Sequence, residues 1–172
     1  MLGALAPLGL ALAAGSALVI DLDSGGPRYP GERSLADLVG TGLRRPDLIP
    51  RPGVAVLRNG GVTPAAAAEV VDALVAAHPT VVLRLPPRPR PAAAGAAVVP
   101  VRLLLPGNLY PWGDQPAVFQ ATPSLTQLPG RGVRLPVPRP ITVESLLRGR
   151  RPPGRDHWVK AWAAAWRFPW GR

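Results

Sequence analysis

The stretch ALVIDLDSGG, residues 17–26, is the part of the sequence that decides the fold assignment. It joins an apolar, partly β-branched run to two carboxylates, Asp21 and Asp23, and then to a turn of small residues. Apolar runs of this length that end in turn residues are typical of buried strands. The two aspartates are therefore either reactive groups at a strand end or only the polar terminus of that strand.

Helix and strand patterns alternate on both sides of this stretch. Helix starts are indicated by Ser34, with Asp37 completing a capping box, and by Thr63, which Pro64 follows. The expected elements are a helix over 2–14, a strand over 17–22, a helix over 34–41, a strand over 53–58, a helix over 63–77 and a strand over 80–85. Apolar strands separated by helices indicate a parallel sheet covered on both faces, with an α+β arrangement as the alternative.

The second half of the chain gives weaker patterns, because most of the 24 prolines lie after Pro79. The expected elements are an edge strand over 98–105 interrupted by Pro100, strands over 117–121 and 132–137, a helix over 141–148 capped by Thr142, and a terminal helix over 155–168. We therefore expect an α/β fold. It should contain a small, mostly parallel sheet of about four to six strands flanked by helices, and an irregular, proline-rich C-terminal half.

The carboxyl ends of the strands are where an open parallel sheet binds its ligands. Asp21 and Asp23 stand at such an end, where two carboxylates could hold Mg²⁺ through water or orient an attacking water. A structural alternative is that Asp21 pairs with Arg84 across neighbouring strand ends. The turn 59–61 precedes a helix, so Asn59, Gly60 and Gly61 are weak candidates for a phosphate cradle. The favoured interpretation of this turn is that its backbone angles require glycine.

The order of these segments resembles that of the MinD/ParA-type P-loop ATPases, including their pilus-assembly branch. The matching segments are ALVIDLDSGG (17–26), GVAVLRNGG (53–61), TVVLRLPP (80–87) and, more weakly, PGRGVRLPVPRPITVESLL (129–147). The main resemblance covers residues 2–105 and implies a P-loop-like fold. It also implies that Asp21 and Asp23 match the family's D-x-D motif, whose acidic residues help to position the attacking water.

The departures from the family concern its phosphate site. The family's phosphate-binding loop precedes the helix matched by residues 2–14, and no G-x-x-x-x-G-K-[ST] motif occurs in the sequence. We therefore expect this loop to be missing, unless the true start codon lies upstream. The only lysine, Lys160, belongs to the expected terminal helix, and Arg84 replaces the Walker B aspartate. A cation thus stands where the family has a carboxylate that organises the metal.

These departures argue against an enzyme. We expect a non-catalytic, MinD/ParA-like pseudo-ATPase that serves as a scaffold or regulatory interaction protein, with a protein partner such as an intact related ATPase. ATP and Mg²⁺ are cofactors only if the resemblance is functional, and a weak nucleotide-binding ATPase is the second alternative. We expect the protein to be cytoplasmic, and a peripheral position on the cytoplasmic side of a membrane is the alternative.

The first alternative is a membrane-associated protein, anchored by an N-terminal apolar run or by the C-terminus. Residues 2–20 contain no charge. A helix followed by a strand is the favoured interpretation, because Gly15 and Ser16 divide the run; a membrane span and a signal peptide are the alternatives.

The C-terminal segment is basic and rich in tryptophan. The net charge is +10, and residues 131–172 contribute ten basic and two acidic residues to it, or +8. The candidate interaction residues are Trp158, Trp162, Trp166, Lys160 and Arg167. The tryptophans, spaced four apart, would line one helix face that packs as core or meets a membrane or protein partner; nucleic acid is the least favoured partner. We divide the chain into a degenerate MinD/ParA-like domain, 1–150, and a Trp-rich helix or tail, 151–172.

Metal and thiol chemistry have little support in the composition. The chain has no cysteine, which excludes disulfides, a catalytic thiol and cysteine-ligated metals. Its only histidines are His78 and His157, and His78 falls in the expected last turn of a helix. We therefore assign no metal ligands.

Overall fold

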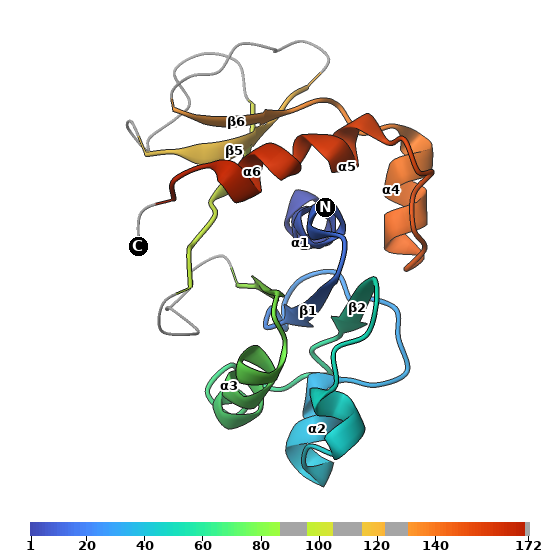
Figure 1. Cartoon of the computed structure of the whole chain (residues 1–172), viewed down its shortest axis with the longest axis vertical. Coiled ribbons are helices and arrows are strands. Elements are labelled where there is room, and N and C mark those ends of the chain that lie inside the picture. The colour runs from blue at the N-terminus through green and yellow to red at the C-terminus, as the bar shows by residue number, and fades with distance from the viewer. Residues whose placement is uncertain (87–95, 105–114, 123–130, 171–172) are drawn as a thin grey trace.

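The structure is a computed structural model that describes residues 1–86, 96–104, 115–122 and 131–170. Its strands form two three-stranded sheets, in the orders β2-β1-β3 and β4-β5-β6, and every strand pair is parallel. Helices flank both sheets (Figure 1). The predicted α/β class with parallel strands is thus confirmed, with the six described strands divided between two sheets.

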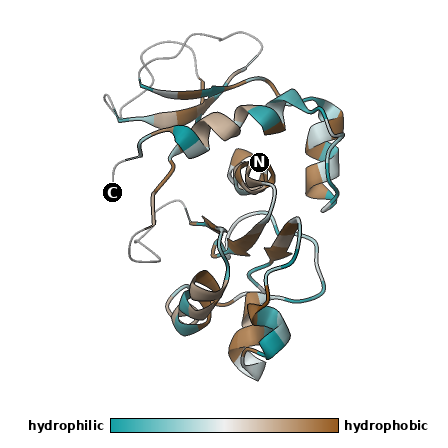
Figure 2. Ribbon diagram, in the orientation of Figure 1, coloured by the Kyte–Doolittle hydropathy of each residue, from teal (hydrophilic) through white to brown (hydrophobic). Residues whose placement is uncertain are grey.

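The first sheet is built around β1, the strand predicted from the opening stretch. It consists of β1 (Ala17–Asp21), β2 (Val54–Leu57) and β3 (Val81–Arg84). All five residues of β1 are buried, since helices cover both faces of this central strand. The register places Asp21 directly opposite Arg84. Figure 2 shows hydrophobic residues along β1 and β2, as the apolar runs in the sequence predicted.

One face of the first sheet is covered by α2 (Leu35–Thr41), the 3₁₀ turn η1 (Arg45–Leu48) and α3 (Ala68–Ala77). The predicted capping box of α2 is present, with Ser34 and Asp37 bonded to each other's backbone N–H. The predicted start of α3 at Thr63 is wrong, because residues 64–67 form a turn and Ala67 is the N-cap. An i→i+3 bond from Ala68 N to Ala65 O separates this turn from the regular helix.

The helix α1 (Leu2–Ala14) covers the other face of the first sheet. It also contacts β4, α4, α5 and α6, so it lies between the first sheet and the C-terminal helices (Figure 1). A helix that is apolar all round suits such a position. Gly15, with a φ of 84°, ends α1 and leads directly into β1, as the helix-and-strand interpretation predicted. None of the described helices is both long and apolar enough to cross a membrane.

The second sheet contains β4 (Val101–Leu103), β5 (Ala117–Gln120) and β6 (Gly132–Leu135). The strand β4 begins directly after Pro100 and lies at the edge of the sheet, as that proline predicted. The residues of β5 are all buried, which agrees with its central position. The last residue of the predicted strand over 98–105 lies outside the described residues.

The C-terminal region forms α4 (Pro140–Leu147), α5 (His157–Ala161) and α6 (Ala163–Arg167). The prediction that Thr142 caps α4 is wrong, because Arg139 is the N-cap and Pro140 is the first helical residue. The single terminal helix predicted over 155–168 is also wrong. It divides at Trp162, where i→i+3 bonds from Trp162 N to Val159 O and from Ala165 N to Trp162 O interrupt the α-helical pattern. Residues 171–172 of the predicted tail lie outside the described residues.

Candidate functional site

The candidate site lies at the carboxyl ends of β1 and β3, where Asp21 and Asp23 meet Arg84. Asp21 is the last residue of β1, and its Oδ1 accepts a 3.0 Å hydrogen bond from the backbone N–H of Asp23. Residues two apart on a strand lie on the same face, and this bond holds the chain in a turn at the strand end with both carboxylates on the same guanidinium. Arg84 Nη1 lies 3.3 Å from Asp21 Oδ2, and Arg84 Nη2 lies 2.8 Å from Asp23 Oδ2.

Arg84 is enclosed by this part of the fold, which engages both of its Nη atoms but leaves its buried Nε without a hydrogen-bond partner among the described residues. Its side chain is only 3% exposed, and Nη1 also donates a 2.6 Å hydrogen bond to the carbonyl of Pro27. Its Cζ lies 5.2 Å from the centre of the Tyr29 ring, which is a cation–π distance. The pairing of Asp21 with Arg84, which was the structural alternative for the aspartates, is therefore present.

Gly26 makes room for this guanidinium. A Cβ atom at position 26 would overlap Arg84 Nη2 and Asp23 Oδ2, and it would lie 3.0 Å from Arg84 Cζ. Gly25 has no such constraint from Arg84, and its backbone N–H donates to Asp23 Oδ1 at 3.1 Å. The small residues of the opening stretch thus serve the ion-pair cluster as well as the turn. Sequence reasoning did not identify this role of Gly26.

The turn at Asn59, Gly60 and Gly61 borders the same cluster. The buried Asn59 side chain donates to the carbonyls of Asp21 at 3.2 Å and of Val62 at 3.0 Å, and it accepts from Gly61 N–H at 2.7 Å. Gly60 and Gly61 have φ values of 77° and 95°, which explains the need for glycine at both positions. The Asn59 amide joins the turn to β1, and a Cβ atom at position 60 would overlap the Ser34 side chain.

The ionisation of the cluster follows from its burial. Desolvation raises the pKa of Asp21 from its ordinary value of 3.8, while the Asp23 N–H and the Arg84 charge act in the opposite direction. Desolvation also raises the pKa of Tyr29 above its usual range. The neutral Tyr29 hydroxyl donates a 2.6 Å hydrogen bond to the carbonyl of Ala4, which ties the cluster to α1.

No family model, curated protein or solved structure matches the chain. The functional assignment therefore depends on the geometry of the described residues and on the resemblance of the sequence motifs.

The described residues, 1–86, 96–104, 115–122 and 131–170, contain no group of three or more His, Asp or Glu side chains placed to hold a metal ion. His78 is the C-cap of α3, and its Nδ1 lies 3.0 Å from the Leu74 carbonyl. Because a carbonyl only accepts hydrogen bonds, Nδ1 carries a proton in this contact.

The tryptophans predicted as interaction residues divide between core and surface. Trp158 and Trp162 are 2% and 0% exposed and pack edge to face at 5.6 Å, so they belong to the core in this structure. Gly9 of α1 allows this packing, because a Cβ there would overlap the Trp162 indole. Trp166 is 44% exposed and donates its indole N–H to Leu10 O at 2.8 Å, while Lys160 and Arg167 are also exposed.

A second buried polar group, centred on Asp156, fixes the C-terminal helices, and sequence reasoning did not identify it. Asp156 caps α5 by accepting from the N–H groups of Trp158 at 2.9 Å and Val159 at 3.0 Å, and it also accepts from the Thr142 hydroxyl. Arg139 Nη2 adds an ion pair at 3.1 Å. Burial acts to raise the pKa of Asp156, but these bonds outweigh burial and lower it. The available signal was Asp156 itself, because aspartate is a preferred N-cap residue directly before a helix.

Proposed function

We propose that this protein is a non-catalytic, MinD/ParA-like interaction protein, a pseudo-ATPase in which Arg84 fills the metal and water position. The observation that carries the proposal is the buried guanidinium between Asp21 and Asp23. In an open parallel sheet this is the edge where a ligand binds. The carboxylates that would hold Mg²⁺ or orient a water are here paired with a cation that the chain itself supplies.

The hydrogen bonds to the carboxylates support the same proposal. All four carboxylate oxygens of Asp21 and Asp23 accept a hydrogen bond, two from backbone N–H groups and two from Arg84. Mg²⁺ requires a nearly ideal octahedron of oxygen ligands, which one or two carboxylates and several waters usually supply. A magnesium ion would therefore have to displace a guanidinium that is itself buried, which leaves that cation without its partners.

The proposed activity is binding to another protein. The partner that the resemblance suggests is an intact ATPase of the MinD/ParA type, with this chain acting as its scaffold or regulator in the cytoplasm. The exposed basic residues of the C-terminal region would add long-range attraction to an acidic partner surface.

A titration of the full chain with Mg²⁺-ATP tests the non-catalytic part of the proposal. Calorimetry should detect no binding that depends on Asp23, and phosphate release should equal that of the Asp23→Ala variant. Binding or hydrolysis that Asp23→Ala abolishes would overturn the proposal. Sedimentation of the chain mixed with purified MinD/ParA-type ATPases of the same organism tests the partner, and failure to associate with any of them removes that partner.

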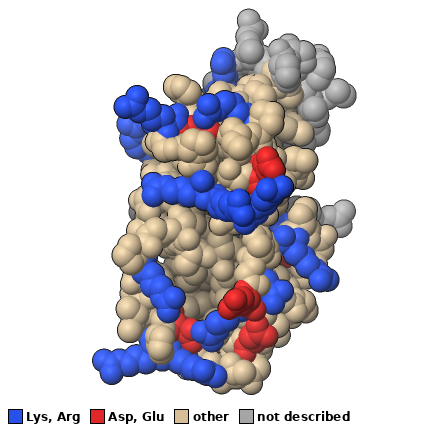
Figure 3. Space-filling model, turned by 90° about the vertical axis from the view of Figure 1, so that its right-hand side faces the viewer, with Lys and Arg blue, Asp and Glu red and all other residues tan. Residues whose placement is uncertain are grey.

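A peripheral position at an anionic membrane is the second candidate, and α4 is the observation that favours it. Ile141 and Leu147 of α4 are 49% and 43% exposed. Exposed arginines flank them in the sequence, at positions 139, 148, 150 and 151. Figure 3 shows a band of Lys and Arg side chains across one face of the molecule. Apolar side chains between cations suit a lipid interface.

Vesicle sedimentation separates this candidate from a purely soluble role. The chain should bind vesicles of phosphatidylglycerol and phosphatidylcholine but not of phosphatidylcholine alone, and Leu147→Ser should weaken that binding. Equal binding to both vesicle types, or none to either, would remove the membrane candidate.

A further inference from the structure

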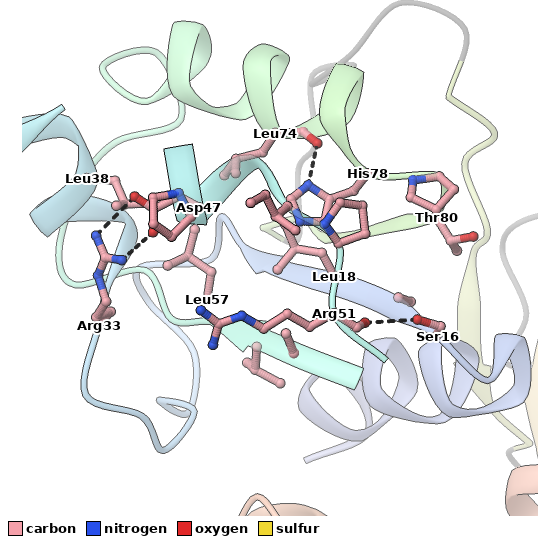
Figure 4. A pocket seen from close by; sticks show the side chains of 17 residues that line it. Ser16, Leu18, Arg33, Leu38, Asp47, Arg51, Leu57, Leu74, His78 and Thr80 are labelled. Carbon is pink, nitrogen blue, oxygen red and sulfur yellow. Dashed lines mark hydrogen bonds and ion pairs between the residues drawn. The ribbon is translucent and has the colours of Figure 1, made fainter. Parts of the chain in front are cut away.

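A separate pocket of about 250 Å³ lies on the α3 side of the first sheet, near the amino ends of its strands. It is bounded by the start of β1, by β2, by η1 and by the end of α3 (Figure 4). Its apolar lining includes Leu18, Leu38, Ala55, Leu57 and Leu74. Four of these side chains belong to the core under this face of the sheet, whereas Ala55 is exposed because no helix covers it. The pocket is thus an opening onto the core.

Among the charged side chains at the rim of the pocket, Arg51 is available to bind a ligand. Arg33 and Asp47 form a bidentate ion pair, so Asp47 is already neutralised. Ser16 donates a 3.1 Å hydrogen bond to the backbone carbonyl of Arg51 and fixes that residue at the rim. Figure 4 shows the Arg51 side chain extended across the pocket toward Leu57. Within the described part of the chain, no hydrogen bond or ion pair engages its guanidinium.

We propose that this pocket binds a small amphipathic carboxylate. The apolar part of the ligand lies on the leucine-lined floor, and its carboxylate pairs with the Arg51 guanidinium. A guanidinium matches a carboxylate through two parallel hydrogen bonds, which a cationic or neutral ligand cannot form. An apolar lining with a few convergent polar groups is the usual composition of a small-molecule site.

The size of the pocket limits the ligand. Its volume of about 250 Å³ lies slightly below the usual range of small-molecule pockets, which suits a small monocarboxylate. The pocket adjoins the amino end of β1, whereas Asp21 is the last residue of that strand, at its carboxyl end. The proposed carboxylate site is therefore separate from the Arg84 cluster, and it does not depend on the proposed function.

Ligand titrations of the full chain test the proposal, with hexanoate, octanoate and phenylacetate as probes. Octan-1-ol and octylammonium serve as the neutral and cationic counterparts of octanoate. We expect at least one carboxylate to bind with a Kd of about 1 mM or tighter, and to shift the backbone amide signals of Leu18, Ala55 and Leu57 in NMR spectra. We expect octan-1-ol and octylammonium to bind about tenfold more weakly than octanoate.

Three variants connect any binding to the pocket. Arg51→Gln should weaken carboxylate binding about tenfold, whereas Arg45→Gln, an exposed arginine of η1 outside the lining, should leave it unchanged. Ala55→Leu should fill the pocket and abolish binding while circular dichroism shows an unchanged fold. The proposal is overturned if no carboxylate binds, if octan-1-ol binds as well as octanoate, or if Arg51→Gln binds like the wild type. A folded Ala55→Leu variant that retains binding would also overturn it.

Discussion

Replacing Arg84 by methionine should destabilise the protein strongly, because it removes the cation of a buried cluster. The substitution keeps an unbranched apolar stem but removes the guanidinium and its contacts to Asp21, Asp23 and Pro27. Asp21 is 2% exposed, so its carboxylate would remain buried without a cationic partner. Removing one member of a buried pair costs about 3–5 kcal/mol, and we expect a loss of that size in the free energy of unfolding at neutral pH.

The loss should depend on pH in a direction that identifies Asp21 as its source. The pKa of Asp21 is raised from 3.8 in the folded wild type, so its contribution to stability is fully present below pH 3.8 and is lost as pH rises through the folded pKa. Arg84→Met removes a charge that lowers this pKa, so the folded pKa rises further in the variant. The difference between variant and wild type should therefore shrink on acidification, by at most about 1.4 kcal/mol per pH unit.

Urea unfolding followed by circular dichroism and tryptophan fluorescence measures these differences. The double variant Asp21→Asn, Arg84→Met should be more stable than Arg84→Met alone at neutral pH, because it has no unpaired charge at position 21. The reasoning is refuted if Arg84→Met unfolds within about 0.5 kcal/mol of the wild type. A loss that does not change with pH would refute the assignment to Asp21.

Two further substitutions test the C-terminal core. Gly9→Ala should lower the free energy of unfolding by about 1–2 kcal/mol, since overpacking against the Trp162 indole outweighs the gain in helix propensity. Gly3→Ala is the control in the same helix: its Cβ would meet no atom within 4 Å, so it should not destabilise the protein. Asp156→Ala should cost about 1–2 kcal/mol at neutral pH through the lost cap of α5. Because the pKa of Asp156 is lowered from 3.8, the wild type should lose its stability advantage over Asp156→Ala as pH falls below 3.8. Denaturant midpoints at several pH values measure the loss at neutral pH and its decrease in acid.

The first sheet could be predicted because each of its strands is an apolar run bounded by a turn. Gly15 and Ser16 separated α1 from β1, and the register that follows brings Asp21 opposite Arg84. Strand alternation places Asp21 and Asp23, two residues apart, on the same face. The turn made by the hydrogen bond from Asp23 N–H to Asp21 is a local detail that alternation does not predict. The role of Gly26 depends on an arginine almost sixty residues away, which no local pattern indicates.

The misassigned caps have a common physical cause. Thr63 and Thr142 were both chosen because a threonine before a helical pattern is a good N-cap. Thr63 instead accepts from the Ala66 N–H in the turn that precedes α3, and Thr142 is buried and donates to Asp156. A hydroxyl satisfies the same hydrogen-bonding need in a cap, a turn or a tertiary contact. The sequence locates such a residue near a helix start, and tertiary packing decides which of the three roles it takes.

The buried cluster links the stability of the fold to the proposed loss of catalysis. A metal ion that bound Asp21 and Asp23 would separate Arg84 from them, and Arg84 is 3% exposed. If that separation costs the same 3–5 kcal/mol as removing a partner, it weakens metal affinity by about two to four powers of ten. The two aspartates of the D-x-D motif are the partners of the buried Arg84 cation, so the presence of the motif is no evidence of hydrolysis. The loss of unfolding free energy in Arg84→Met then measures what it costs a metal ion to displace Arg84. A small loss would mean that a metal could displace Arg84 readily, and the proposed non-catalytic role would lose its main support.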